Sequence, residues 1–136
     1  SGNVLFETAS DDETHAALKA RIEKALGERF GYDAWIVLVE HADLEGIVAG
    51  FPYPEVDGMQ PYVLFASDAA ALAEVSARAA ELDPADGERA EPGPGVLYWE
   101  VARGSSTDTP FAKFLARARF KAVTTTRNLR TLRKLL

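Results

Sequence analysis

The sequence predicts an α+β fold, and three observations support this. Short apolar runs rich in β-forming residues alternate with longer segments in which apolar residues recur at helical spacing. Within residues 61–126 these segments follow the order strand, helix, strand, strand, helix, strand. Segments rich in glycine and proline, such as residues 83–95 with three of each, supply the turns between them.

The first half of the chain is predicted to contain a strand, a helix, a strand and a helix. The strands lie at residues 4–7 and 35–39, where the apolar runs are too short for helices. An amphipathic helix over residues 13–30 starts from a Ser-x-x-Glu capping box at residues 10–13. A second, shorter helix covers residues 42–49.

A polar link at residues 55–60 marks the best internal boundary. It follows the Gly50–Pro54 segment, whose two prolines stop the preceding helix. We therefore predict two domains, residues 1–58 and residues 59–136.

The second half contains four predicted strands and three predicted helices. Asp68 and Thr109 precede two of the helices and can cap them, and Thr109 is followed by a proline that suits the first helical position. The strands cover residues 61–66, 88–91, 96–102 and 122–126, and the helices cover residues 68–82, residues from Pro110 to about Ala118, and residues 129–136. This order is the βαββαβ plan of a ferredoxin-like unit, in which both helices cover one face of an antiparallel sheet.

Composition predicts a soluble, cytoplasmic protein. Apolar residues make up 47% of the 136-residue chain and charged residues 26%. The longest apolar runs are far shorter than the roughly 20 residues that span a membrane, and no signal peptide is recognisable. The absence of cysteine excludes disulfides and thiolate chemistry.

Charge is unevenly distributed along the chain. Residues 100–136 contain nine lysines and arginines but two acids, although the whole chain has a net charge of −6. A basic end on an acidic body can pair internally, attract an anionic partner, or do both, and we favour charge balance within the chain or between subunits.

Three sequence words are shared with a known family. They are Ser1-Gly2-Asn3-Val4-Leu5-Phe6, Gly50-Phe51-Pro52-Tyr53-Pro54 and Thr124-Thr125-Thr126-Arg127-Asn128. On these words the chain resembles the family catalogued as domain of unknown function 1697 (DUF1697), along essentially its whole length. The resemblance implies two ferredoxin-like (α-β plait) units in tandem, the first truncated at its N-terminus and the second followed by a C-terminal helix. It implies no assigned activity.

The resemblance also implies that about 45 family residues are absent before Ser1, including a Gly-rich turn and a central strand. Without that central strand, the strands at 4–7 and 35–39 would have unpaired backbone groups. Three outcomes are open. The two strands pair directly, a strand from a second copy fills the gap in a homo-oligomer, or the natural protein contains the absent segment. Leu129 also stands where the family usually has tryptophan.

Few residues suggest catalysis. His15 follows three acids that suit the start of a helix, so we predict no metal site and no cofactor. His41 follows a predicted strand, and we consider it a candidate acid–base group. No nucleophile elbow and no phosphate-binding loop is present.

The terminal Thr-Thr-Arg-Asn word gives the candidate ligand-binding residues Arg127, Asn128 and Thr126. At a predicted junction of strand and helix, they can bind a carboxylate or phosphate. Equally, Arg127 can clamp the terminal helix to the acidic first unit, which we favour.

The leading hypothesis is a soluble binding or interaction module of unknown ligand, with a small anionic ligand as the candidate. The first alternative is an enzyme that acts on a small anionic substrate, with Arg127 as anchor and His41 as base. The second is nucleic-acid binding, with Tyr62 and Tyr98 stacking bases on the open face of the sheet. The acidic body opposes that alternative.

Overall fold

The structure is a computed structural model, and it describes residues 3–8, 13–31 and 36–136, with the side chain of Ala118 excepted. The chain divides into two compact units, Ser1–Val39 and Glu40–Lys134. They are called unit 1 and unit 2 below. The division predicted between residues 58 and 59 rests on the polar link alone and stays a prediction.

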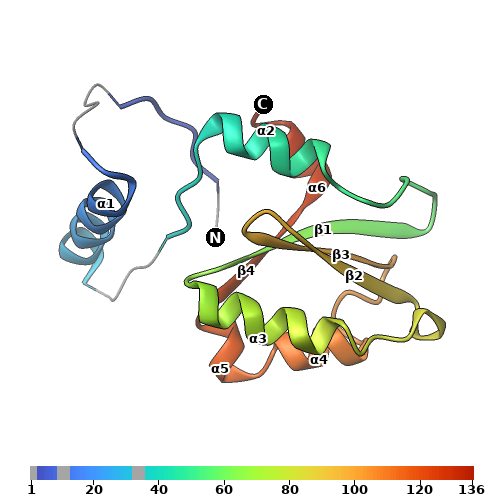
Figure 1. Ribbon diagram of the computed structural model, residues 1–136. Helices are drawn as coiled ribbons and strands as arrows, with labels where there is room; N and C mark the ends of the chain where they lie inside the picture. The colour runs from blue at the N-terminus through green and yellow to red at the C-terminus, as the bar shows by residue number, and fades with distance from the viewer. Residues whose placement is uncertain (1–2, 9–12, 32–35) are drawn as a thin grey trace. The chain divides into compact units, whose positions relative to one another are not determined.

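Unit 2 is a mixed α/β structure built on a four-stranded antiparallel sheet (Figure 1). Its elements are α2 His41–Ala49, β1 Met59–Ala66, α3 Ala69–Ala79, the 3-10 turn η1 Pro84–Asp86, β2 Glu88–Gly93, β3 Val96–Ala102, α4 Pro110–Leu115, α5 Ala118–Lys121, β4 Thr124–Asn128 and α6 Leu129–Arg133. The strands lie in the order β2-β3-β1-β4, and each neighbouring pair is antiparallel. Where the structure describes the chain, no helix has the length and apolar content needed to cross a bilayer.

Helices cover both faces of this sheet. Helices α3, α4 and α5 lie against one face and helices α2 and α6 against the other, as Figure 1 shows. We call these the α3 face and the α2 face. The sequence predicted two helices on one face, which fits α3 and α4, but it did not predict that the second face would be covered as well.

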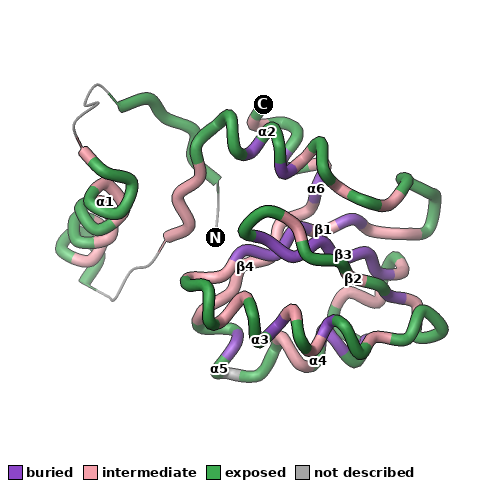
Figure 2. The backbone as a smooth tube through the Cα atoms, viewed as in Figure 1, coloured by how far each residue is buried: buried purple, intermediate pink, exposed green. Residues whose placement is uncertain are grey.

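The α3 face carries the main apolar core. Side chains of β1 and β3 that alternate along each strand pack against α3, α4 and α5. The row that β3 turns towards this core is Leu97, Trp99 and Val101. The fully or almost fully buried members of the core are Leu64, Val75, Ala79, Leu97, Trp99, Val101, Phe111, Ala112 and Phe120. Figure 2 shows this burial in the central strands.

Several predicted boundaries of unit 2 shift. Helix α3 ends at Ala79 rather than near residue 82, because the next residues form tighter bonds three residues back, such as Leu82 N to Ala79 O at 3.1 Å. The helix that starts at Pro110 breaks into α4 and α5. Strand β4 covers Thr124–Asn128 rather than residues 122–126, since its last two residues pair with β1.

In the described part of unit 1 the regular element is a helix, α1 His15–Phe30. Thr14 caps its start, accepting a hydrogen bond from Ala17 N at 3.1 Å, and Gly31 ends it in the left-handed conformation at φ +72°. Ser10 of the predicted capping box lies outside the described residues. The helix therefore starts two residues later than predicted.

The two strands predicted for unit 1 are not confirmed in its described residues. Residues 3–8 and 36–39 contain no strand, and Trp35 lies outside the described residues. A strand needs a ladder partner, and the direct pairing considered above does not form between these segments. Val4 and Leu5 are 84% and 63% exposed, and α1 buries no side chain (Figure 2).

Candidate functional site

Tyr98 anchors the α2 face of the sheet. Its side chain is 2% exposed, and its hydroxyl donates a hydrogen bond to Ile47 O, at 2.7 Å, in the last turn of α2. Two glycines make room for it. A Cβ atom at Gly93 would lie 2.3 Å from the Tyr98 ring, and one at Gly50 would lie 2.9 Å from the hydroxyl. Gly93 therefore leaves no room for a side chain while the Tyr98 ring is in place, and a side chain at Gly50 would have to displace the hydroxyl.

A chain of aromatic rings leads outward from Tyr98. Phe51 packs edge-to-face on Tyr98 with a centroid distance of 5.5 Å, and Tyr53 packs edge-to-face on Phe51 at 5.6 Å. The Gly50–Pro54 segment was predicted to stop α2. In the structure it also fixes the position of the Tyr53 ring.

Arg89 lies over that ring and pairs with a buried carboxylate. Its Cζ is 4.0 Å from the centroid of Tyr53, and its Nε donates to Glu100 Oε1 at 2.9 Å. The two charged residues are opposite each other in the β2–β3 register. Glu100 is 3% exposed, whereas the Arg89 side chain is 44% exposed.

The outer nitrogens of Arg89 are uncommitted. Within the described residues, the guanidinium has no hydrogen-bond or ion-pair partner besides Glu100, and the Tyr53 hydroxyl makes no hydrogen bond. The Nε edge of the guanidinium is thus fixed by Glu100, and the side chain is 44% exposed with donors left over at its outer nitrogens. Such a fork matches the geometry of a carboxylate or phosphate.

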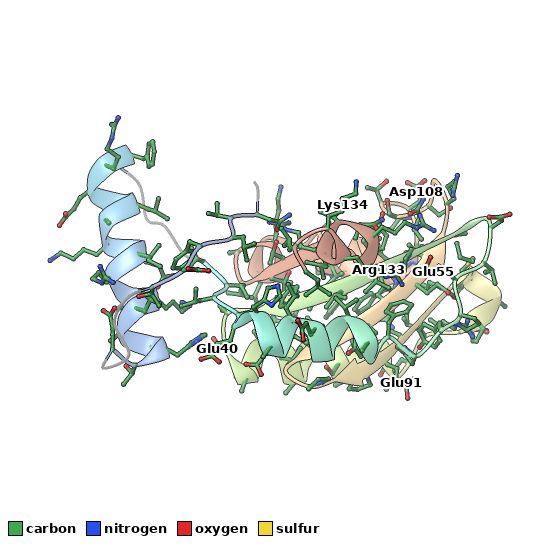
Figure 3. All side chains as sticks on the ribbon, turned by 90° about the horizontal axis from the view of Figure 1, so that it is seen from above. Glu40, Glu55, Glu91, Asp108, Arg133 and Lys134 are labelled. Atoms are coloured by element: carbon green, nitrogen blue, oxygen red, sulfur yellow. The ribbon has the colours of Figure 1, made fainter. Side chains whose placement is uncertain are left out.

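Glu91 completes this group, which we call the Arg89 cluster: Arg89, Glu100, Tyr53 and Glu91. Glu91, labelled in Figure 3, is exposed. It is paired with Tyr98 in the β2–β3 register, and it therefore lies on the same side of β2 as Arg89. Burial raises the pKa of the Tyr53 hydroxyl, Glu91 raises it further, and Arg89 opposes that increase. Burial also raises the pKa of Tyr98. Both hydroxyls therefore keep their protons at neutral pH.

A second buried carboxylate, Glu88, lies on the α3 face and is fully used by the fold. It is 1% exposed, its Oε1 accepts from Trp99 Nε1 at 2.9 Å, and its Oε2 accepts from Phe111 N at 3.1 Å. Phe111 N lies in the first turn of α4, where a backbone amide has no acceptor within the helix, and Glu88 supplies one. The next amide, Ala112 N, donates to the cap Thr109. Glu88 is thus a structural residue.

The predicted ligand-binding residues Arg127, Thr126 and Asn128 do not converge. They alternate along β4, so Arg127 shares the α2 face with Val63 while Thr126 and Asn128 lie on the α3 side. Asn128 caps α6 by accepting from Arg130 N at 2.9 Å, and its amide donates to Gln60 Oε1 at 3.2 Å. Arg127 lies within the strand and donates to the carbonyl of Thr126.

The basic terminal helix pairs with an acid of its own unit. Glu55 contacts both Arg133 Nη1 and, at 3.9 Å, Arg130 Nε, and Figure 3 shows Glu55 beside Arg133. Glu55 belongs to the polar link that follows the Gly50–Pro54 segment. This contact is an internal charge balance of the kind favoured from the sequence.

The two histidines lie at helix starts. His41 Nδ1 is 3.4 Å from Glu45 Oε1, one helical turn along α2, and its side chain is half-exposed. His15 is the exposed first residue of α1. Across the parts of the chain that the structure describes, no three histidine, aspartate or glutamate side chains gather as a metal site would require.

The aromatic pair behind the nucleic-acid alternative is on two different faces, so the expectation that both rings share an open face is wrong. Tyr62 is opposite Trp99 in the register and stacks near it, at 5.4 Å, on the α3 face, whereas Tyr98 is buried on the α2 face. Residues alternate across a strand, and these two do not occupy equivalent positions.

Sequence reasoning missed the Arg89 cluster. The signal was present: Arg89 and Glu91 alternate along an edge strand, and Glu100 interrupts an otherwise apolar strand. A charged residue at an inward position of a strand calls for a partner on the neighbouring strand. That argument would have paired Glu100 with Arg89 once the register was known.

Comparison with known families gives one match. The family model described as "Protein of unknown function (DUF1697)" matches residues 1–98. The matched range contains two of the three sequence words and also Tyr53, Arg89 and Glu91, while the Thr124–Asn128 word lies beyond it. No curated protein and no solved structure matches the chain.

Proposed function

The chain belongs to the DUF1697 family of proteins of unknown function, and on that premise we propose that it is a binding module whose ligand is a small molecule with a carboxylate group. The observation that carries the proposal is the half-exposed guanidinium of Arg89, which Glu100 and Tyr53 hold in place while its outer donors stay uncommitted.

Immobilisation of Arg89 is what distinguishes it from an ordinary surface arginine. A free arginine side chain loses roughly 2 kcal/mol of rotamer freedom when it is fixed. In this protein the fold has already fixed the guanidinium through a buried carboxylate and an aromatic ring. A ligand that binds there therefore meets a lower entropic cost.

The proposal is tested by nuclear magnetic resonance with a panel of small carboxylates at millimolar concentration. We expect saturable shifts of the Arg89 Nε–H and of the Tyr53 ring, and their loss in Arg89→Lys, which keeps the charge but removes the planar fork. Arg103→Lys is the matched control, because Arg103 is an exposed arginine outside the cluster. Equal, non-saturating shifts at Arg89 and Arg103 would refute the proposal.

The finer fold assignment is also a proposal. We infer that residues 59–128 form a ferredoxin-like (α-β plait) unit, because the βαββαβ order and the strand order β2-β3-β1-β4 agree with that plan. The tandem arrangement with a truncated first unit stays a prediction. A crystal structure with a differently ordered sheet would contradict the assignment.

Self-association through unit 1 is a second proposed interaction. It is supported by three consecutive apolar side chains, Val4, Leu5 and Phe6, all of which are exposed. We expect Leu5→Asp to shift a homo-oligomer towards monomer in light scattering. Val56→Asp is the control, since Val56 is an exposed apolar residue of unit 2. An unchanged mass for Leu5→Asp would exclude this route.

The remaining hypotheses have less support. The enzyme alternative names His41 and Arg127, for which the structure gives Glu45 and the Thr126 carbonyl as partners. The nucleic-acid alternative has lost the aromatic surface on which it was based. The cytoplasm is the compartment that we propose, on the ground that the sequence has no cysteine.

A further inference from the structure

The Arg89 cluster has more negative than positive charge. Two carboxylates, Glu100 and Glu91, accompany the single guanidinium of Arg89. Glu100 already neutralises Arg89, since the two are paired at 2.9 Å. Glu91 adds a further negative charge close enough to act on the Tyr53 hydroxyl. A simple anion that approaches Arg89 is therefore repelled by Glu91.

The positions of Arg89 and Glu91 suggest how a ligand avoids this repulsion. Both residues lie on one side of the edge strand β2, two residues apart, and both are exposed. Two residues of an extended strand span roughly 7 Å. The strand thus presents a positive and a negative group side by side, with Tyr53 held beside them by its contact with Arg89.

We propose that the ligand of this site is a zwitterion, whose carboxylate binds the outer nitrogens of Arg89 and whose ammonium group binds Glu91. This inference rests on the proposed function and specifies its ligand class. An amino-acid-like molecule with several bonds between its two charges matches the separation along the strand. Tyr53 keeps the guanidinium in place from below, so the binding nitrogens of Arg89 stay at a fixed position relative to β2.

Other simple ligands fit less well. A ligand with a carboxylate alone forms an ion pair with Arg89, but Glu91 stays unpaired and repels it. A lone ammonium gains Glu91 but meets the guanidinium and leaves the donors of Arg89 without an acceptor. A zwitterion satisfies both groups and adds no net charge to an acidic cluster.

The test compares acetate, methylammonium, glycine and γ-aminobutyrate by titration of the Arg89 Nε–H resonance at constant ionic strength. We expect γ-aminobutyrate to bind most tightly, with glycine behind it because its charges are close together. Glu91→Gln should weaken γ-aminobutyrate about three- to fivefold, as expected for a half-exposed ion pair, and should strengthen acetate. Glu74→Gln is the matched control, because Glu74 is an exposed acid of α3 on the other face of the sheet.

Each result separates this inference from the proposed function. The inference is supported if the zwitterions bind more tightly than acetate and methylammonium, and if Glu91→Gln weakens γ-aminobutyrate but strengthens acetate. Suppose that acetate binds at least as tightly as γ-aminobutyrate and that Glu91→Gln lowers the affinity for neither ligand. The proposal of a zwitterionic ligand is then wrong, while the proposal of a carboxylate site at Arg89 stands. If none of the four compounds gives a saturable shift at Arg89, both proposals fail.

Discussion

The two faces of the sheet each contain a buried glutamate, and the two residues differ in what they leave unused. On the α3 face, Glu88 accepts one hydrogen bond at each oxygen, from Trp99 and from the first turn of α4. On the α2 face, Glu100 is paired with Arg89, whose outer nitrogens have no further partner in the described residues. The hydrogen bonds of Glu88 thus stay inside the core, whereas those of Glu100 lead to the partly exposed side chain of Arg89.

The difference separates a carboxylate that serves the fold from one that orients a surface group. Glu88 is 1% exposed and accepts hydrogen bonds from Trp99 and Phe111 in the core, so it lies out of reach of a ligand. Glu100 orients a half-exposed arginine, and this is the arrangement on which the proposed binding role of Arg89 rests.

The largest effect is expected for Glu88→Ala. The change leaves Trp99 Nε1 and Phe111 N buried without acceptors and creates a cavity, which should lower the free energy of unfolding by about 3 to 5 kcal/mol. Urea denaturation measures it, with the exposed α1 residue Glu28→Ala as control. A loss below about 1 kcal/mol would show that Glu88 is not the structural residue described.

Arg89→Ala should have a smaller effect, about 1 to 2 kcal/mol, because Arg89 is partly exposed and its loss strands the buried Glu100. The double variant Arg89→Met with Glu100→Leu should recover most of this loss, since apolar groups replace both charges. Thermal denaturation of both variants, with the unsubstituted protein as reference, checks this. A double variant that regains stability and ligand binding together would contradict a binding role for Arg89.

Tyr98→Phe should cost about 1 kcal/mol through the lost hydrogen bond to Ile47 O. It should also alter the alkaline stability profile. Burial raises the folded-state pKa of Tyr98, so the unfolded chain loses this proton first as the pH rises past about 10. The free energy of unfolding therefore falls above that pH, and the decline should be shallower in Tyr98→Phe. Equal slopes in both proteins would show that Tyr98 does not titrate as described.

Tyr53→Phe should have the smallest effect on stability, below about 0.5 kcal/mol, because the hydroxyl makes no hydrogen bond to any described residue and the ring is kept under Arg89. Tyr53→Leu removes the cation–π contact and should cost about 0.5 to 1 kcal/mol. Chemical denaturation distinguishes the two. A larger loss of stability in Tyr53→Phe than in Tyr53→Leu would show that the hydroxyl, rather than the ring, stabilises the fold.

Local sequence signals predicted most of unit 2. Asp68 and Thr109 cap the helices that follow them, accepting from Ala71 N at 2.7 Å and Ala112 N at 3.2 Å, as their residue types indicate. Strand β3 has the predicted bounds. These features depend on residues close together in the chain, so a single sequence contains them.

Features that depend on distant residues were not predictable. The strands expected in unit 1 need a ladder partner, and residues 3–8 and 36–39 find none among the described residues. Burial of Tyr98 depends on α2 and on two glycines, one of them in β2. The Arg89 cluster brings together the segment after α2, β2 and β3. Its register is set by the whole sheet rather than by any local pattern.

Titration of the Arg89 Nε–H resonance with γ-aminobutyrate decides whether the fold holds Arg89 ready to bind a ligand. We expect a saturable shift at Arg89, accompanied by one of the Tyr53 ring, that is weaker in Glu91→Gln and absent at Arg103. A response at Arg89 that does not saturate and equals that of Arg103 would contradict a binding role for Arg89.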